Sequence, residues 1–269
     1  MANQHERTAW LKGGDAQCLT PPGQPLGRPW RLVLLGAPGV GKGTQAELLS
    51  ERLRACHLST GDIFRAAKSG CSNDGKLSPA LERALDLMRR GNLVPDDIVL
   101  AMVSERGRCL RCGGGFILDG FPRTVAQAEA TEGLLKREQV QLTAVFNYEL
   151  PIDEIVSRLG ARRVCTGCKA VYHLVNRPPK AKGICDHCGA KLEHREDDRP
   201  EAIRVRMQSY QQSTMPLIDF YWQRGLLITI EASGTPEEIY ERTRQMAKGQ
   251  LPPGQEFPAA PMAEKAGRG

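Results

Sequence analysis

The chain has 269 residues, of which 41% are hydrophobic and 25% charged, enough for a sizeable core in one large or two modest domains. This composition excludes a wholly disordered chain. The sequence contains neither the roughly 18 consecutive apolar residues of a membrane span nor, in its first thirty residues, the apolar segment of a secretory signal. We therefore expect a soluble cytoplasmic protein without a membrane partner.

The net charge and the cysteines narrow the function classes. With 37 basic and 31 acidic residues the net charge is +6, which does not by itself indicate nucleic-acid binding and fits a small anionic substrate equally well. Nine cysteines are an odd number. Without an export signal, they favour thiols or metal ligands over a fully paired disulfide framework.

Between two Gly- and Pro-rich ends, apolar runs and helical patterns alternate. In chain order we expect a strand over 31–35, a helix over 41–54, a strand over 116–119, a helix over 124–138, a strand over 145–150, a helix over 152–161, a helix over 200–224, a strand over 226–231 and a helix over 236–248. This alternation predicts an α/β fold with a parallel sheet covered on both faces.

Four segments depart from the alternation. Residues 1–29 are expected to form a flexible arm and residues 251–269 a disordered tail, because both are rich in Gly and Pro. A transit peptide is the alternative for the first segment, although acidic residues are present there and serine is absent. Residues 59–94 have a helical pattern only, and residues 161–198 have no helical period. Both are expected to be insertions at the ligand-binding edge of the sheet.

A glycine-rich segment, Gly36–Thr44 (GAPGVGKGT), lies between a predicted strand and a predicted helix. Glycines let backbone N–H groups turn toward phosphate oxygens at a helix N-terminus. Lys42 can reach the β- and γ-phosphates of a nucleotide, and Thr44 can contact Mg²⁺. A plain glycine-rich turn is the alternative, which the flanking strand and helix disfavour.

Two further segments carry a resemblance to a known family. They are Ser59–Asp62 (STGD), followed by Arg65, and Asp119–Thr124 (DGFPRT), followed by Gln127. Together with the glycine-rich segment, they resemble nucleoside monophosphate kinases and, among these, adenylate kinases with a zinc-binding lid. The resemblance runs from about residue 31 to about residue 248. It implies a P-loop NTPase-type fold and the reversible transfer of the terminal phosphoryl group of Mg-ATP to AMP, giving two ADP.

The resemblance also implies a domain organisation. The core would comprise residues 30–58, 95–160 and 199–250, residues 59–94 would bind AMP, and residues 161–198 would form the lid over ATP. We expect a monomer whose partners are ATP, AMP and ADP, with no nucleic acid.

Site residues follow from the resemblance residue by residue. The expected ATP-binding residues are Gly39, Val40, Gly41, Lys42, Gly43, Thr44, Arg158, Arg162, Val171 and Tyr172. The expected AMP-binding residues are Thr60, Arg65, Leu93, Val94, Gly120, Phe121, Pro122, Arg123, Gln127, Arg195 and Arg206. The expected catalytic residues are Lys42, Asp119, Arg123, Arg162, Arg195 and Arg206.

For some of these residues the expected contact can be specified, and another interpretation is open. Arg158 would stack on the donor adenine, and Thr60 and Gln127 would contact the acceptor adenine. A solvated surface charge is the alternative for any one arginine, and it is the interpretation we favour for Arg204. Asp119 ends an apolar run, so its carboxylate can orient Mg²⁺ through waters at the edge of the sheet. Asp62 is either a second such carboxylate or a helix cap.

No general base is needed for this chemistry. A phosphate acceptor whose second pKa is about 6 is already mostly ionised at pH 7. Two other functions remain alternatives: a nucleoside monophosphate kinase with a different acceptor base, and a P-loop protein that binds ATP without transferring its phosphate. Thr60 favours adenine, and the second set of phosphate-binding residues favours transfer.

The cysteines include two C-x2-C pairs, Cys165 with Cys168 and Cys185 with Cys188, separated by sixteen residues. This spacing predicts a four-thiolate, structural Zn²⁺ site in the lid. Redox disulfides and an independent nucleic-acid-binding zinc ribbon are the alternatives.

The remaining five cysteines have no such pattern. Cys109 and Cys112 form a lone C-x2-C pair, for which two ordinary thiols are favoured over a second metal site or a regulatory disulfide. Plain thiols are expected at Cys18, Cys56 and Cys71.

Overall fold

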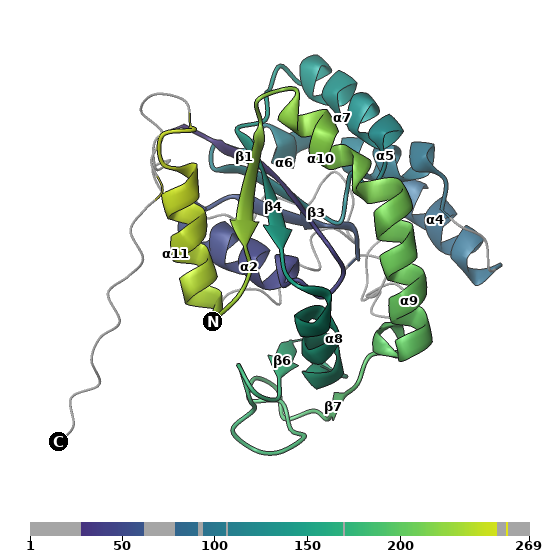
Figure 1. Ribbon diagram of the computed structural model, residues 1–269. Coiled ribbons are helices and arrows are strands. Elements are labelled where there is room, and N and C mark those ends of the chain that lie inside the picture. The colour runs from purple at the N-terminus through teal and green to yellow at the C-terminus, as the bar shows by residue number, and fades with distance from the viewer. Residues whose placement is uncertain are drawn as a thin grey trace.

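A parallel sheet lies at the centre of the computed structural model, which describes residues 28–61, 79–90, 94–105, 107–168, 170–251 and 257 (Figure 1). Its five strands are ordered β2-β3-β1-β4-β8, with all four pairings parallel. They are β1 (Trp30–Gly36), β2 (Cys56–Ser59), β3 (Gly115–Asp119), β4 (Ala144–Glu149) and β8 (Leu227–Glu231). The predicted α/β fold with a parallel sheet is confirmed.

The central strand β1 supplies both hydrophobic cores. Val33 and Leu35 pack on one face of the sheet, and Leu32 and Leu34 pack on the other. Side chains alternate across a strand, so a strand covered on both faces is a continuous aliphatic run. This explains the sequence WRLVLLG of β1, in which all residues but Arg31 are buried.

Helices cover both faces of the sheet (Figure 1). The core on one face contains residues of α2 (Lys42–Leu53) and α11 (Pro236–Ala247). The core on the other contains residues of α4 (Pro79–Arg89), α5 (Asp96–Ser104), α6 (Gly107–Leu110), α7 (Val125–Arg137) and α10 (Pro216–Trp222). Within the part of the chain that the structure describes, no helix is long and apolar enough to cross a membrane.

The helix expected over residues 200–224 is divided into two. α9 (Pro200–Ser209) passes through a π-helical turn, Tyr210–Thr214, into α10. Pro216 lacks an N–H group and interrupts the regular hydrogen bonding. The N–H of Met215 instead reaches the carbonyl of Tyr210, five residues back, at 2.9 Å. The prediction of one uninterrupted helix was therefore wrong.

Strand β2 was not predicted. It pairs with β3 at the edge of the sheet, with Ser59 opposite Asp119. The strand has only four residues, CHLS, too few for a clear alternation of polar and apolar side chains. Its pairing brings the start of the STGD segment next to the DGFPRT segment.

A second, antiparallel sheet, ordered β6-β5-β7, lies in the predicted lid. Its strands are β5 (Arg162–Cys165), β6 (Val171–His173) and β7 (Leu192–Glu193). It follows α8 (Ile152–Ala161), and the short 3-10 helix η2 (Glu196–Asp198) leads from it into α9. In Figure 1 this sheet lies beyond α8, away from the helices that cover the central sheet.

One residue of the expected C-terminal tail is packed against the core. Phe257 is 8% exposed, and its ring centroid lies 4.4 Å from that of Trp30 and 6.2 Å from that of Tyr240. The expectation of disorder was therefore wrong at this residue, because its aromatic ring finds an apolar site beside the first residue of β1.

Candidate functional site

The glycine-rich loop joins β1 to α2, as its sequence predicts. Gly36 has a φ of +135°, and a Cβ there would lie 2.4 Å from the carbonyl oxygen of Tyr148 on β4. Gly39 has a φ of +89°, and a Cβ there would lie 2.7 Å from the Leu159 side chain on α8. Only glycine fits either position without strain. The loop is thus held tightly between β4, α8 and the start of α2.

Lys42 is the first residue of α2, and its side chain curls back over the loop. The ammonium donates to the carbonyl oxygens of Gly36 at 2.6 Å and Ala37 at 2.9 Å. Burial lowers the pKa of Lys42 to about 8. The carboxylate of Asp119 opposes this shift, while the guanidinium groups of Arg123, Arg206 and Arg162 add to it.

The charged groups that shift the pKa of Lys42 are all residues predicted to bind phosphate or Mg²⁺. Three arginines from the DGFPRT segment, β5 and α9 lower the pKa of one ammonium group, and the carboxylate of Asp119 raises it. These guanidinium groups are suited to a polyanionic ligand, although Arg162 and Arg206 also have the carboxylate of Asp198 as a counter-ion. A bound phosphate would offset the repulsion and raise the pKa of Lys42 again.

Asp119 lies at the carboxyl end of β3, the edge of a parallel sheet at which ligands bind. Its Oδ2 is 3.2 Å from Nε2 of His57 on β2. The same oxygen would lie 3.8 Å from a Cβ at Gly43, next to Lys42. The carboxylate thus faces the start of α2. His57 was not singled out in the sequence, because β2 itself was not predicted.

Arg162 and Arg206 share a buried carboxylate. Asp198 is 2% exposed and accepts from Arg162 Nε at 2.7 Å and from Arg162 Nη2. Nη1 of Arg206 lies 3.4 Å from Asp198 Oδ1 and donates to the Asp197 carbonyl oxygen at 2.9 Å. A buried carboxylate needs such cationic partners.

Arg195 joins this group through the neighbouring acid. Its Nε lies 3.2 Å from Asp197 Oδ1, so two of the three acids of η2, Asp197 and Asp198, contact the three arginines that were predicted from the lid and α9. Neither acid was singled out in the sequence. The acidic run 196–198 next to Arg195 is a signal that could have identified them.

The DGFPRT segment forms a second polar cluster. Both the Thr60 hydroxyl, at 3.0 Å, and Arg123 Nε, at 2.7 Å, donate to the carbonyl oxygen of Gly120. The Thr214 hydroxyl of the π-helical turn donates to the Arg123 carbonyl oxygen at 3.1 Å. The predicted residues Thr60, Gly120 and Arg123 are therefore brought together, and Phe121 and Pro122 beside them are buried.

Gln127 is buried in the first turn of α7 behind Arg123. Its Oε1 accepts from the Arg123 backbone N–H at 2.7 Å, and its Nε2 donates to Asp96 Oδ1 at 2.5 Å. Asp96 is the first residue of α5 and was not predicted as a site residue. No sequence motif distinguishes it from the adjacent Asp97.

Arg158 of α8 connects the glycine-rich loop to the end of β8. Nη1 donates to the Val40 carbonyl oxygen at 3.1 Å and Nη2 to the Ala232 carbonyl oxygen at 2.7 Å. Burial lowers the pKa of Arg158, and the carboxylate of Glu154 opposes that shift. The planar guanidinium is thus fixed beside the loop. Arg204, in contrast, is exposed on α9, as expected.

Some predicted site residues lie outside the described residues, namely Asp62, Arg65 and Leu93. Val94 is described and packs, half-buried, against the core that contains α5 and α7. Thr44 follows Lys42 in α2 and is half-buried.

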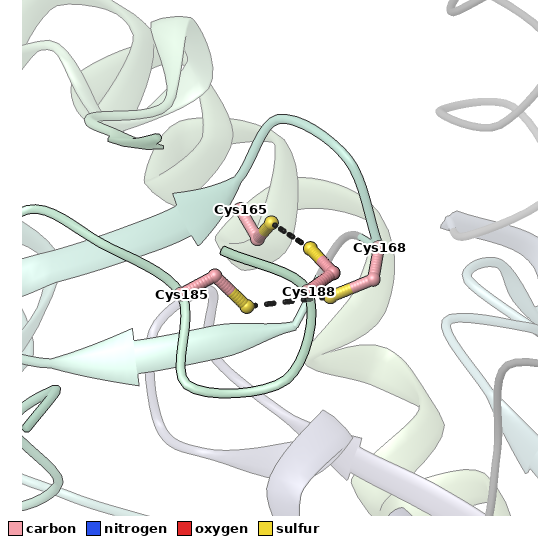
Figure 2. A group of neighbouring side chains, drawn as sticks. All are labelled: Cys165, Cys168, Cys185 and Cys188. Atoms are coloured by element: carbon pink, nitrogen blue, oxygen red, sulfur yellow. Dashed lines mark hydrogen bonds between the residues drawn. The ribbon is translucent and has the colours of Figure 1, made fainter. Parts of the chain in front are cut away.

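The four predicted zinc ligands come together in the lid, and their sulfur atoms point toward one another (Figure 2). The Sγ atoms all lie within 4.8 Å of one another, with 3.4 Å between Cys165 and Cys188 and 3.5 Å between Cys168 and Cys185. A tetrahedral site with Zn–S bonds of about 2.3 Å has sulfurs roughly 3.8 Å apart. The cluster therefore fits a zinc ion.

The chemistry of these thiols also fits a cation. Burial raises the pKa of Cys168 to about 12. Burial raises that of Cys185 too, but hydrogen bonds from the Tyr172 hydroxyl and the backbone N–H groups of His187 and Cys188 outweigh it and bring that pKa to about 6. Four sulfurs at this spacing repel one another when ionised, so a divalent cation is needed for all four to be thiolates.

Tyr172 occupies the interior of the lid rather than its outer surface. Its side chain packs in the small core that contains Cys165, Cys185 and Leu192, and its hydroxyl accepts from the Asp186 N–H at 2.8 Å. The Tyr172 side chain is therefore occupied by contacts within the lid, and its predicted contact with ATP stays a prediction. Val171, the preceding residue, is half-buried in β6.

The other described cysteines differ in burial and in disulfide bonding. Cys109 is buried, Cys112 is half-buried, and neither forms a disulfide. Cys56 is disulfide-bonded. The expectation of a plain thiol at Cys56 was therefore wrong, because a single cysteine gives no sequence signal of its partner.

Comparison with known proteins decides the family. The sequence model of the adenylate kinase family, described as "Adenylate kinase", matches residues 34–226. The chain belongs to the adenylate kinase family.

Individual adenylate kinases match most of the chain at high identity. A protein named adenylate kinase from Streptomyces coelicolor is 46% identical over 219 residues, covering 81% of this chain and 98% of that protein. The adenylate kinase of Caldicellulosiruptor saccharolyticus is 45% identical, covering 81% and 97%. That of Archaeoglobus fulgidus is 43% identical, covering 78% and 94%. The similarity thus spans the core and both predicted insertions.

Proposed function

We propose that this protein catalyses the reversible transfer of the terminal phosphoryl group of Mg-ATP to AMP, giving two ADP. The observation that carries this proposal is that the positive charges of Arg123, Arg162 and Arg206 all act on the ammonium of Lys42 and lower its pKa. Three guanidinium charges that act on one phosphate-loop lysine suit two nucleotides whose phosphates meet. The relatives named adenylate kinase support the same reaction.

In this reaction an oxygen of the AMP phosphate attacks the γ-phosphorus of ATP as the bond to the ADP oxygen breaks, without a phosphoenzyme. Such transfer depends on positioning and on neutralising charge on the transferred group. Lys42 would exchange the carbonyl oxygens of Gly36 and Ala37 for phosphate oxygens, and the three arginines would offset the charge that develops in the transition state.

Mg²⁺ would be held with the ATP phosphates by Asp119, through waters, and by Thr44. A bound ion would supply positive charge that offsets the charge of the phosphate oxygens. The orientation of Asp119 toward the start of α2 supports this assignment. His57, by donating to Oδ2, would keep the carboxylate in that orientation.

The acceptor nucleotide would lie against the DGFPRT segment. Arg123, Arg195 and Arg206, with Arg65, would bind the AMP phosphate. Thr60 and Gln127 would contact its adenine, with Leu93 and Val94 along the base. The hydrogen bonds that join Thr60, Gly120 and Arg123 support a single acceptor site there. A different acceptor base is the second candidate, and the proposed assay distinguishes it.

The lid would close over ATP with a structural Zn²⁺ bound by Cys165, Cys168, Cys185 and Cys188. Four thiolates leave no open coordination position, so the ion would stabilise the lid and take no part in catalysis. A segment of about 38 residues buries too little surface to be stable alone. We also propose that residues 59–94 close over AMP, which would exclude water from the reaction.

We further propose that the protein acts as a monomer in the cytoplasm, on ATP, AMP and ADP alone. The mild net charge of +6 supports small anionic substrates over nucleic acid.

The direct test is to incubate the protein with Mg-ATP and each of AMP, UMP, CMP and GMP, and to quantify the diphosphates. We expect rapid ADP formation with AMP and little product with the other three. Lys42→Met serves as the control for contaminating kinases and should be nearly inactive. An absence of product with AMP would contradict the proposal, and a preference for UMP, CMP or GMP would establish the second candidate.

A further inference from the structure

Gln127 has both ends of its amide fixed by groups of opposite hydrogen-bonding character. Its Oε1 accepts from the Arg123 N–H at 2.7 Å, and its Nε2 donates to Asp96 Oδ1 at 2.5 Å. A backbone N–H can only donate, and an ionised carboxylate can only accept. Turning the amide over would place Nε2 against the Arg123 N–H and Oε1 against the Asp96 carboxylate. Both contacts would then be repulsive, so one orientation of the amide is enforced.

The group that enforces it is itself held in place. The second oxygen of Asp96, Oδ2, lies 3.4 Å from the Thr124 hydroxyl. Thr124 caps α7, its Oγ1 accepting from the backbone N–H of Gln127 at 3.1 Å. Asp96 at the start of α5 is therefore attached to the start of α7 at two points. Gln127 is only 6% exposed, so its amide has few alternative partners in water.

The fixed amide still has one lone pair on Oε1 and one N–H on Nε2 to offer a ligand. An acceptor next to a donor matches adenine, whose 6-amino group donates and whose adjacent ring nitrogen accepts, as in the bidentate pairing of Gln with adenine. A 6-oxo purine presents an acceptor at the same position, opposite the Oε1 lone pair. It would be bound well only if the amide were reversed.

We propose that Asp96 is a specificity-determining residue, which selects a 6-amino over a 6-oxo purine nucleotide by holding the Gln127 amide in one orientation. This rests on the proposed function, in which Gln127 contacts the acceptor base. Asp96 touches no substrate itself. Its effect is on the choice between substrates, because a binding site built around a fixed donor and acceptor rejects a ligand that leaves them unpaired or opposed.

The test compares AMP with IMP, which has an oxygen in place of the 6-amino group and no further exocyclic group. The variant Asp96→Asn keeps the shape of the side chain but can present either a donor or an acceptor to Gln127. The matched control is Asp97→Asn, which removes an equivalent charge from the same exposed turn of α5. The quantity measured is the ratio of kcat/KM for AMP to kcat/KM for IMP, with Mg-ATP as donor.

We expect the parent protein and Asp97→Asn to share one AMP preference, and Asp96→Asn to lower that ratio by about tenfold, the factor for a hydrogen bond to a charged group. A purely structural role of Asp96 would lower kcat/KM for both nucleotides together and leave the ratio unchanged. That result, with AMP still preferred by the parent, would overturn this inference alone. A parent protein that does not phosphorylate AMP would overturn the proposed function as well.

A second variant guards against loss of structure. Asp96→Ala removes the acceptor altogether and should also lower the ratio, while thermal melts compare its stability with that of Asp97→Ala. If both Asp96 variants retain the parental ratio, the orientation of Gln127 is set without Asp96 and the inference is wrong.

Discussion

Asp198 and Arg162 form a two-point ion pair in which the carboxylate is buried and the guanidinium lies where the lid joins the core. Arg206 of α9 shares the same carboxylate. One acid of η2 thus connects the first strand of the lid to the helix that follows it. Asp198 therefore contacts two proposed phosphate-binding arginines, of which Arg206 is also held by Asp197.

Asp198→Asn keeps the shape of this side chain and removes its charge. Because Arg162 loses its counter-ion and Arg206 loses one of two, we expect the free energy of unfolding to fall by about 1–3 kcal/mol and the KM for ATP to rise. Denaturant titration and steady-state kinetics measure the two effects. The control is Glu193→Gln, which removes an exposed partner of Lys191 and should change stability by less than about 0.5 kcal/mol. Equal effects of the two substitutions would show that Asp198 does not position the arginines.

Lys42 should make nucleotide binding dependent on pH. Its pKa of about 8 in the free protein means that the ammonium loses its proton as the pH rises through 8, whereas a bound phosphate needs the charged form. We therefore expect the affinity for ATP, measured by calorimetry, to fall between pH 7 and pH 9, with proton uptake on binding near pH 8. Lys42→Met should bind ATP weakly with no such dependence. If the affinity of the parent for ATP did not depend on pH, the lowered pKa of Lys42 would be contradicted.

The lowered pKa of Lys42 also affects the stability of the fold. Affinity for ATP should fall as the pH rises, whereas the contribution of Lys42 to stability should increase. Lys42 in the unfolded chain keeps its proton up to about pH 10.4, whereas the folded form releases it near pH 8. Between these values the unfolded state binds more protons, so the contribution of Lys42 to stability becomes more favourable as the pH rises. We therefore expect the free energy of unfolding of the parent, minus that of Lys42→Met, to be larger at pH 9 than at pH 7. Denaturant titrations of both proteins at the two pH values measure this difference.

The lid should contain one zinc ion per chain, detectable by elemental analysis. Cys165→Ala removes one of four ligands and should abolish stoichiometric zinc and lower the thermal midpoint, because metal binding and lid folding are coupled. The control is Cys112→Ala, which removes a half-buried thiol outside the cluster and should retain the metal. A Cys165→Ala variant as stable as the parent would contradict the structural role of zinc.

Phe257 should stabilise the fold by packing against Trp30, the first residue of β1. Phe257→Ala leaves the rings of Trp30, Phe146 and Tyr240 with an unfilled contact, and we expect up to about 3 kcal/mol of destabilisation. Turnover of ATP and AMP should be unchanged. Trp222→Ala is the control, since Trp222 is 70% exposed and its loss should cost little. Equal stability of both variants would mean that Phe257 is packed without energetic consequence.

The parts of the site that were predictable from sequence are those whose functional residues lie within a few positions of one another along the chain. The glycine-rich loop, the DGFPRT segment and the paired cysteines each combine special residues within a few positions, and a strand or helix pattern lies beside them. The core strands were predictable for the same reason, since β1 and β4 are continuous buried runs. A short polar edge strand such as β2 has no comparable pattern.

The partners of the site residues were not predictable. Asp96, His57 and Asp198 are ordinary polar residues whose importance arises from tertiary contacts with Gln127, Asp119 and Arg162. Their contacts join residues 31, 62 and 36 positions apart, respectively, and no periodicity of one sequence records such pairings. The division of the helix over 200–224 was likewise missed, although Pro216 is a visible cause.

The central claim is that phosphoryl groups pass directly from ATP to AMP. The most direct measurement uses ATP labelled in its γ-phosphate, incubated with AMP, Mg²⁺ and the protein. The account predicts that the label appears in the β-phosphate of the ADP formed from AMP, with two ADP for each ATP consumed. Label released as inorganic phosphate at the same rate with and without AMP would contradict it.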